Sequence, residues 1–428
     1  MSESVSLVRE TGLISAAERN AALDRHVEEI LSAGARRVLL LPPDITRMNS
    51  DAGPITAYLY ARLSPSADVD IMPTLGTHMP MTDHELRVMF GDTIPLSAFK
   101  VHDWRHDIEC LGEVPGELLS EWSEGKLDFS VKVEVNTILR SGYDRLVSIG
   151  QVVPHEVVGL ANYTKNICVG AGGFDIINKS HFLGAVHGME RIMGQMDTPV
   201  RKLFNYAVSE FMGDLPIRYI LTVMAKDESS GVFGMKGLFI GDGDDVFENA
   251  AVLSQNVNII QLDEPLRKVV VYLDPEEFKT TWLGNKAVYR TRMAMADNGE
   301  LIVLAPGLKQ FGEDLGVDTL IRRHGYRGTE ATLRAVKDDP ELAASLGAAA
   351  HLVHGSSEGR FTITYCPGDG MDLDTVRSVG YEAAPLADMT KKYNPETLKD
   401  GFNTLADGEV IFFISNPALG LWGLKENF

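Results

Sequence analysis

Short apolar runs that end in turns and alternate with longer amphipathic stretches recur along this chain. The clearest runs are 37–41, 69–75 and 145–150, and an amphipathic stretch over 16–35 closes at Gly34. Such alternation is typical of α/β architecture, in which helices cover a mostly parallel sheet. We therefore predict a strand at each run and a helix ahead of the first strand.

The chain is long for a single hydrophobic core, because chains beyond roughly 250–300 residues usually divide into domains. It has 428 residues, and strand-like runs begin again after an acidic, proline-containing break at 262–265. We predict two α/β domains, residues 1–265 and 266–412, with a C-terminal tail, 413–428, that packs back on the first domain.

The net charge and the cysteine count argue against several classes of protein. The formal net charge is -20, which opposes binding to nucleic acid or to anionic membranes. The cysteines form no CxxC pair, and neither a secretory signal nor a run of about 18 apolar residues is present. We expect a cytoplasmic protein with neither nucleic acid nor a membrane among its partners.

Polar residues follow each of the three predicted strands. Asp44 and Arg47 come after the first, His78 after the second and His155 after the third. Ligands gather at the carboxyl ends of strands in open α/β sheets, so the three loops predict one shared site.

Each of these residues also has a structural interpretation. Asp44 and Arg47 can form a loop salt bridge, although arginine also holds carboxylates with two parallel hydrogen bonds. His78 and His155 can cap or pack, although histidine suits general acid–base chemistry. His78 precedes Thr82–Glu85, a capping-box pattern that accounts for those residues alone.

The segment 159–193 is the richest in candidate chemistry. Lys165 is followed by Gly170, Gly172 and Gly173, which would let backbone N–H groups approach a phosphate. No Walker A, HExxH or cysteine-rich zinc pattern occurs, but His181 can serve as a nickel ligand.

In the second predicted domain, Trp282 and Lys286 stand four residues apart, so on one helix they would share a face. They can line a cleft, or Trp282 can simply pack against the lysine stem. His102, His106, His351 and His354 form no interpretable pattern.

Taken together, the motifs resemble those of the lactate racemase family over essentially the full chain. The shared pattern is Asp44-x-Thr46-Arg47, Gly76-Thr77-His78 with Pro80-Met81-Thr82, and then His155, Lys165 and His181. The resemblance implies two α/β domains with the active site in the cleft between them. It also implies an isomerase, a racemase or epimerase of 2-hydroxy acids.

The resemblance further implies a metal-binding enzyme that carries a nickel-pincer nucleotide, pyridinium-3,5-dithiocarboxylic acid mononucleotide nickel. Lys165 would hold this cofactor covalently, His181 would bind the nickel, and His78 and His155 would be the catalytic acid–base pair. The remaining assignments are cofactor binding by Asp44, Ile45, Thr46 and Arg47, and substrate binding by Arg47, Lys286 and Trp282.

The implied reaction is hydride transfer from C2 of the substrate to the cofactor ring and back to the opposite face. The cofactor supplies the difficult chemistry, and the protein supplies orientation and proton transfer. Separate cofactor-synthesis enzymes would be needed as maturation partners.

Departures from the family pattern bear on the substrate. Trp282 and Leu283 stand where lactate-specific members carry Tyr and Gln, and Met79 replaces a common Arg. Val169 and the approach 160–164 also differ from the usual surroundings of the lysine. We expect a substrate larger than lactate, such as a sugar acid (aldonate).

Three alternatives remain open. The chain can act on lactate or another short 2-hydroxy acid, or it can be a non-catalytic cofactor-binding homologue. A nicotinamide-dependent dehydrogenase is the third, but its GxGxxG turn is missing from the sequence. The sequence does not indicate the oligomeric state.

Overall fold

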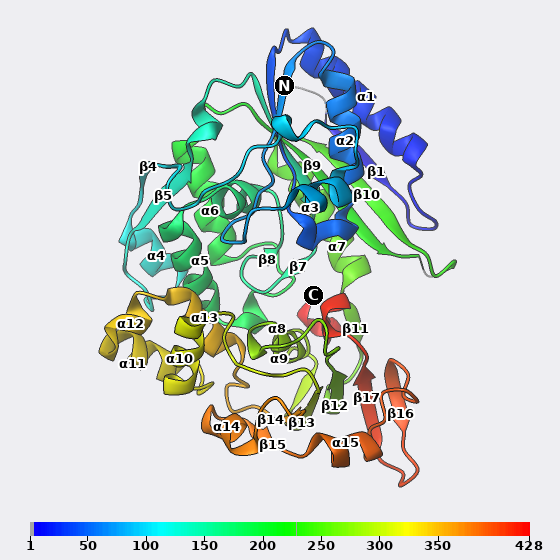
Figure 1. Ribbon diagram of the computed structural model, residues 1–428, viewed down its shortest axis with the longest axis vertical. Coiled ribbons are helices and arrows are strands. Elements are labelled where there is room, and N and C mark those ends of the chain that lie inside the picture. Colours follow the sequence, from blue (N-terminus) through cyan, green and yellow to red (C-terminus); the bar gives the residue numbers. More distant parts are fainter. Residues whose placement is uncertain (1–3, 228) are drawn as a thin grey trace. The chain divides into compact units, whose positions relative to one another are not determined.

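A computed structural model describes residues 4–227 and 229–428, and it confirms the α/β class (Figure 1). The chain forms two compact units. The first consists of Met1–Ser180 and Met193–Asn258, and the second of His181–Ile192 and Ile259–Phe428. The chain therefore passes between the units within helix α5 (Phe174–His187), at 192/193 and at 258/259, whereas the sequence indicated a boundary at 265/266.

The first unit contains a six-stranded sheet in the order β1-β10-β9-β6-β2-β3. Strands β9, β6, β2 and β3 run parallel, and β10 and β1 add to one edge in antiparallel pairing. The strands are β1 (Val5–Val8), β2 (Arg37–Leu41), β3 (Asp68–Ile71), β6 (Arg145–Gln151), β9 (Ile217–Lys226) and β10 (Phe233–Gly241).

Strand β2 has the predicted bounds, but β3 ends earlier than the predicted run 69–75. Proline has no N–H to donate to a sheet ladder, and the chain reaches Pro73 two residues after Ile71. Only an isolated bridge between Pro43 and Thr74 continues the pairing. The loops after β2 and β3 therefore remain side by side beyond the strands.

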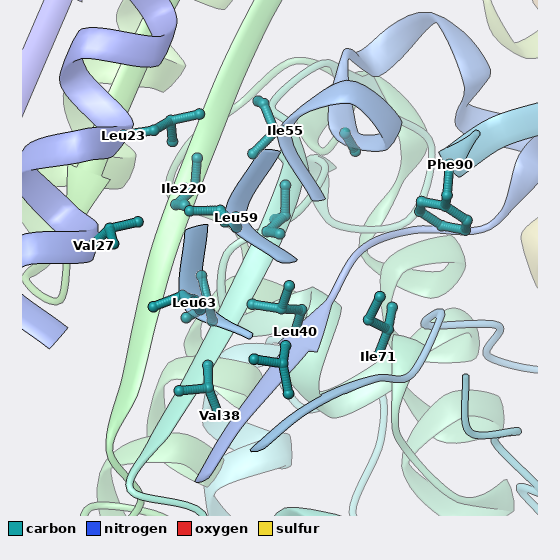
Figure 2. Close-up of a cluster of buried hydrophobic side chains, with 14 of the residues drawn as sticks. Leu23, Val27, Val38, Leu40, Ile55, Leu59, Leu63, Ile71, Phe90 and Ile220 are labelled. Carbon is teal, nitrogen blue, oxygen red and sulfur yellow. The ribbon is translucent and has the colours of Figure 1, made fainter. Parts of the chain in front are cut away.

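Apolar side chains on one face of this sheet pack against helices α1 (Ala16–Ser32), α2 (Ala52–Leu63) and α3 (Asp83–Phe90). Figure 2 shows Val38 and Leu40 of β2 in the same buried cluster as Ile55 and Leu59 of α2. Helix α1 begins with a capping box between Ser15 and Glu18. Each fully buried aliphatic side chain contributes about 1.5–3 kcal/mol, so this layer holds the strands rigidly.

The opposite face of the same sheet carries α7 (Asp244–Asn258), which packs on β9 and β10. The approach is close, because a Cβ at Gly237 would lie 2.5 Å from Leu253 Cδ2. Ser148 and Tyr219, which alternate with core residues along their strands, contact the segment that contains Lys165 on this side. Helix α6 (Pro199–Phe211) also packs there, against the turn after Lys165.

The second unit has its own six-stranded sheet, in the order β15-β14-β13-β12-β17-β16. All of its pairs are parallel except β16 with β17. The strands are β12 (Leu266–Tyr272), β13 (Met295–Ala305), β14 (Thr362–Pro367), β15 (Glu382–Ala383), β16 (Gly401–Thr404) and β17 (Val410–Ile414). Its helices are α8 (Thr281–Gly284), α9 (Lys286–Tyr289), α10 (Leu315–His324), α11 (Thr329–Asp338), α12 (Pro340–Ala343), α13 (Leu346–His354), α14 (Leu373–Ser378) and α15 (Leu386–Lys392).

The C-terminal tail, expected to return to the first domain, groups with the second unit. Strand β18 (Trp422–Leu424) pairs in parallel with β11 (Ile260–Leu262), and the Trp422 amide donates to the Arg290 carbonyl. This pairing also explains why residues from 259 onward group with the second unit.

Within the described part of the chain, no helix combines the length and the apolar character needed to cross a membrane. The three cysteines, Cys110, Cys168 and Cys366, are all free thiols.

Candidate functional site

The loops that carry Asp44, His78 and His155 follow β2, β3 and β6, which are neighbours in the sheet of the first unit. Because these strands are parallel, their carboxyl ends lie at one edge, as the sequence predicted. The structure joins two of the three side chains directly: His78 Nδ1 lies 2.6 Å from Asp44 Oδ2.

Asp44 is a buried carboxylate that forms hydrogen bonds with Thr46 and His78. It precedes the 3-10 helix η1 (Ile45–Ser50) as its N-cap, and its Oδ1 accepts hydrogen bonds from the amide and the hydroxyl of Thr46. Burial raises the pKa of the Asp44 carboxyl, but the hydrogen bonds from His78 and Thr46 outweigh it and leave the pKa below its ordinary value. Asp44 therefore stays ionised beside His78.

His78 lies in the turn between β3 and α3, and its side chain is 58% exposed. Gly76 takes a left-handed φ of 58° in this turn, and its amide donates to the Gly170 carbonyl. The turn thus aims the imidazole while Asp44 fixes its rotation. Thr82 begins α3 with the predicted capping box to Glu85.

His155 is buried and lies in a short hairpin, where β7 (Pro154–His155) pairs with β8 (Gly159–Leu160). Residues 156–158 form the turn of this hairpin. The Val157 amide donates to His155 Nδ1 over 3.1 Å.

These hydrogen bonds assign opposite tautomers to the two imidazoles. A carboxylate only accepts, so His78 carries its proton on Nδ1, and in the neutral ring Nε2 holds a lone pair. An amide only donates, so His155 Nδ1 holds the lone pair and Nε2 carries the proton. One ring offers a proton acceptor at Nε2 and the other offers a donor.

Lys165 is half-buried at the start of a π-helical turn, η4 (Asn166–Gly170). Such turns are rare and often occur at functional sites. Burial, and next the charge of Arg47, lower the pKa of the Lys165 ammonium from 10.5 to about 8. Among the described residues, no hydrogen bond or ion pair engages the Lys165 side chain, so this amine has the character of a nucleophile.

Asn166 anchors the turn that presents Lys165. Its side-chain amide donates to the Leu41 carbonyl and to the Ser148 hydroxyl, and its Oδ1 accepts from Thr74. One buried side chain thereby ties the end of β2, the middle of β6 and the loop after β3 to the turn that carries the lysine. The spacing of the sequence did not indicate this role, because buried amides carry no periodic signal.

The remaining residues of the predicted cofactor-binding segment differ in exposure. The side chain of Ile45 packs against the hydrophobic core, so Ile45 could contact a ligand only through its backbone. Thr46 and Arg47 are exposed. Within 4–227 and 229–428, no hydrogen bond or ion pair holds the Arg47 guanidinium, which is the arrangement expected of a residue that binds an anion.

His181, Trp282 and Lys286 belong to the second unit. His181 is half-buried on α5. Trp282 and Lys286 lie on separate short helices, α8 and α9, and not on the single helix that their spacing indicated, because the helical pattern is interrupted at Asn285. The Lys286 ammonium lies 5.7 Å from the centroid of the Phe278 ring.

Trp282 packs on a histidine that the sequence left unexplained. The His351 ring lies 4.4 Å from the Trp282 ring, and its Nε2 is 3.0 Å from the Tyr326 hydroxyl. Burial lowers the pKa of His351 to about 3, so the ring is neutral. Another such histidine, His102, is buried and lies 3.1 Å from the Gly172 carbonyl, where it supports the end of the π-helical turn.

The described residues contain no group of three or more His, Cys, Asp or Glu side chains arranged to hold a metal ion. A metal held by several protein ligands therefore has no candidate among them. A metal that takes most of its ligands from a bound organic group needs only one side chain.

Comparisons with known proteins agree with this architecture. Residues 3–193 match the model of the lactate racemase N-terminal domain family. No curated protein sequence matches the chain.

Two solved structures share the fold over nearly their full length. A protein from Thermotoga maritima aligns with a TM-score of 0.78 and 22% identity, covering 97% of this chain and 100% of that one. The lactate racemase apoprotein from Thermoanaerobacterium thermosaccharolyticum aligns with a TM-score of 0.70 and 16% identity, covering 96% and 94%. At these identities the likeness concerns the fold.

Proposed function

We propose, from the match of residues 3–193 to the lactate racemase N-terminal domain family, that this chain is an enzyme of the racemase or epimerase type that inverts C2 of a 2-hydroxy acid. The observation that supports this most directly is the pair of hydrogen bonds at Nδ1, from His78 to Asp44 and from the Val157 amide to His155, which favours opposite tautomers for the two rings. Inversion at a hydroxyl-bearing carbon needs one group that takes the hydroxyl proton and one that returns a proton.

His78 suits the base role. When its Nε2 takes the hydroxyl proton, the imidazolium that forms lies 2.6 Å from the ionised, buried Asp44, which stabilises the new charge. His155 would return a proton from Nε2 once its ring is doubly protonated, with the Val157 amide released from Nδ1, so that a neutral imidazole remains. The roles exchange for the other stereoisomer, and His155 must then release the Val157 amide and change tautomer.

The residues present fit a covalently held nickel-pincer nucleotide. Lys165 offers an amine with a pKa of about 8, and a cofactor with its own nickel ligands needs only one imidazole, which we assign to His181. When bound, such a cofactor would supply the hydride acceptor that inversion at C2 requires. We assign the substrate carboxylate to Arg47, and a further contact with the substrate to Lys286.

We propose a substrate larger than lactate, such as an aldonate. Trp282, Leu283 and Met79 depart from the lactate-specific pattern, and Leu283 and Met79 are 38% and 84% exposed. The indole of Trp282 is held in place by His351, so it offers a firm aromatic wall. Lactate or another short 2-hydroxy acid is the alternative substrate.

The test is a stereochemical screen of protein coexpressed with cofactor-synthesis enzymes. Single stereoisomers of lactate, longer 2-hydroxy acids and aldonates are each incubated with protein, and the C2 epimer is measured by chiral chromatography. We expect epimer formation that is lost in His78→Ala, with nickel content retained. A loaded protein that inverts none of these acids would favour the non-catalytic homologue.

A further inference from the structure

Arg201 on α6 is a buried arginine that contacts the loop before Lys165 and pairs with no carboxylate among the described residues. Its guanidinium donates to the Leu160 carbonyl over 2.6 Å and to the Asn162 carbonyl over 3.2 Å. It also donates to the Thr164 hydroxyl over 2.9 Å. A single side chain thus spans the five residues that precede Lys165.

The loop that Arg201 holds has an unusual backbone. Asn162 and Tyr163 both take left-handed conformations, with φ of 65° and 59°. This region is strained for a bulky residue such as tyrosine, so the loop needs tertiary contacts to stay in this conformation. Contacts are present on both sides: Tyr163 donates its hydroxyl to Asp244, and Arg201 lies 4.2 Å from the centroid of the Phe247 ring that stacks on Tyr163.

The same arginine acts on Lys165 through its charge. Burial and Arg47 are the first causes of the lowered Lys165 pKa, and Arg201 adds to them. Arg201 therefore affects the Lys165 amine in two ways. Its hydrogen bonds to the 160–164 loop fix the position of the amine, and its positive charge favours the neutral form of the amine.

We propose that Arg201 is a positioning residue that holds the 160–164 loop in its strained conformation and so presents the Lys165 amine to an electrophilic ligand. This rests on the proposed role of Lys165 as the covalent anchor. It assigns a function to a buried arginine that neither contacts substrate nor binds metal in the proposed mechanism.

The experiment measures the reactivity of Lys165 in protein without cofactor. N-hydroxysuccinimidyl acetate transfers its acetyl group to the amine: the C–N bond forms, N-hydroxysuccinimide leaves, and the amine proton passes to water. Rates for Lys165 and for the exposed Lys391 are read from the same digests by mass spectrometry, between pH 6 and pH 10. Lys391 serves as the internal control.

We expect the wild-type rate at Lys165 to reach half its maximum near pH 8. In Arg201→Met the midpoint should rise, and a rise of about one unit lowers the neutral fraction at pH 8 about fivefold. Arg201→Lys keeps the charge but loses the fork, so its midpoint should stay while its maximal rate falls. Lys391 should be unchanged in both.

Thr164→Val removes one hydrogen-bond acceptor of Arg201 and leaves the arginine in place. This variant replaces Arg201→Met in the experiment if Arg201→Met does not fold. Its maximal rate at Lys165 should fall while circular dichroism stays native. Unchanged rates and midpoints at Lys165 in folded variants would overturn the proposal. Normal labelling behaviour in a protein that never loads nickel would instead contradict the proposed function and leave the role of Arg201 intact.

Discussion

At the scale of single residues, the proposed base His78 depends on a buried carboxylate that stays ionised. Asp44 accepts hydrogen bonds from His78 and Thr46, and these outweigh the effect of burial on its pKa. The resemblance to the family suggested cofactor binding for Asp44, whereas the geometry engages both of its oxygens within the protein. Its main effect should therefore be on proton transfer by His78.

We predict that Asp44→Asn lowers turnover by about 10²-fold or more, because general acid–base catalysis contributes 10²–10⁴-fold and this variant removes the group that orients and stabilises the base. Nickel per chain should stay at the wild-type level. The measurement is turnover per bound nickel beside the nickel content. Loss of nickel with normal turnover of the remaining loaded protein would show that Asp44 serves the cofactor.

The same carboxyl predicts a dependence of stability on pH. Its folded pKa lies below the ordinary value of 3.8, so its contribution is fully present above that value and is lost as the pH falls through the folded pKa. We expect the unfolding free energy of Asp44→Asn to lie below wild type at pH 6 and to converge with it as the pH falls below 3.8 and through the folded pKa. Denaturant titrations at several pH values measure this difference, and a gap that widens in acid would contradict the assignment.

At the scale of elements, regular structure was predictable and local irregularity was not. The helix at α1, the strands β2 and β6 and the capping box at Thr82 follow from periodicity and capping chemistry. The hairpin around His155 and the π-helical turn after Lys165 leave no such trace, because both depend on contacts with distant residues. Asn166 and Arg201 were missed for the same reason.

The turn after Lys165 depends on the lack of a side chain at Gly170. A Cβ there would lie 2.7 Å from Thr74 Cβ and 3.0 Å from Asn166 Oδ1. We predict that Gly170→Ala destabilises the protein by about 1–3 kcal/mol through overpacking. Thermal unfolding checks this, with Gly316→Ala on the exposed start of α10 as a control, which should change the midpoint little. Equal effects of both substitutions would contradict the tight packing at Gly170.

At the scale of the whole molecule, the net charge of -20 repels an anionic substrate, and local cations must overcome that field. Arg47 is the cation of the first unit assigned to this task. The acidic surface thus slows the association of an anionic substrate, whereas the cations of the site strengthen its binding once it has arrived.

We predict that kcat/KM for an anionic 2-hydroxy acid rises a few-fold when ionic strength increases from about 0.01 M to 0.15 M. Screening shortens the range of the repulsion from about 30 Å to about 8 Å over this interval. Steady-state kinetics across a salt series measure the effect. A fall in kcat/KM would mean that the positive field of the site dominates capture.

The proposed function depends most on Lys165, as the anchor of a nickel-bearing cofactor. The most direct test is the intact mass and nickel content of protein coexpressed with cofactor-synthesis enzymes, beside Lys165→Ala. We predict a mass adduct and nearly one nickel per chain in the wild type, with both missing from the variant. No adduct and no nickel in the wild type, with a control racemase matured in the same cells, would contradict the claim.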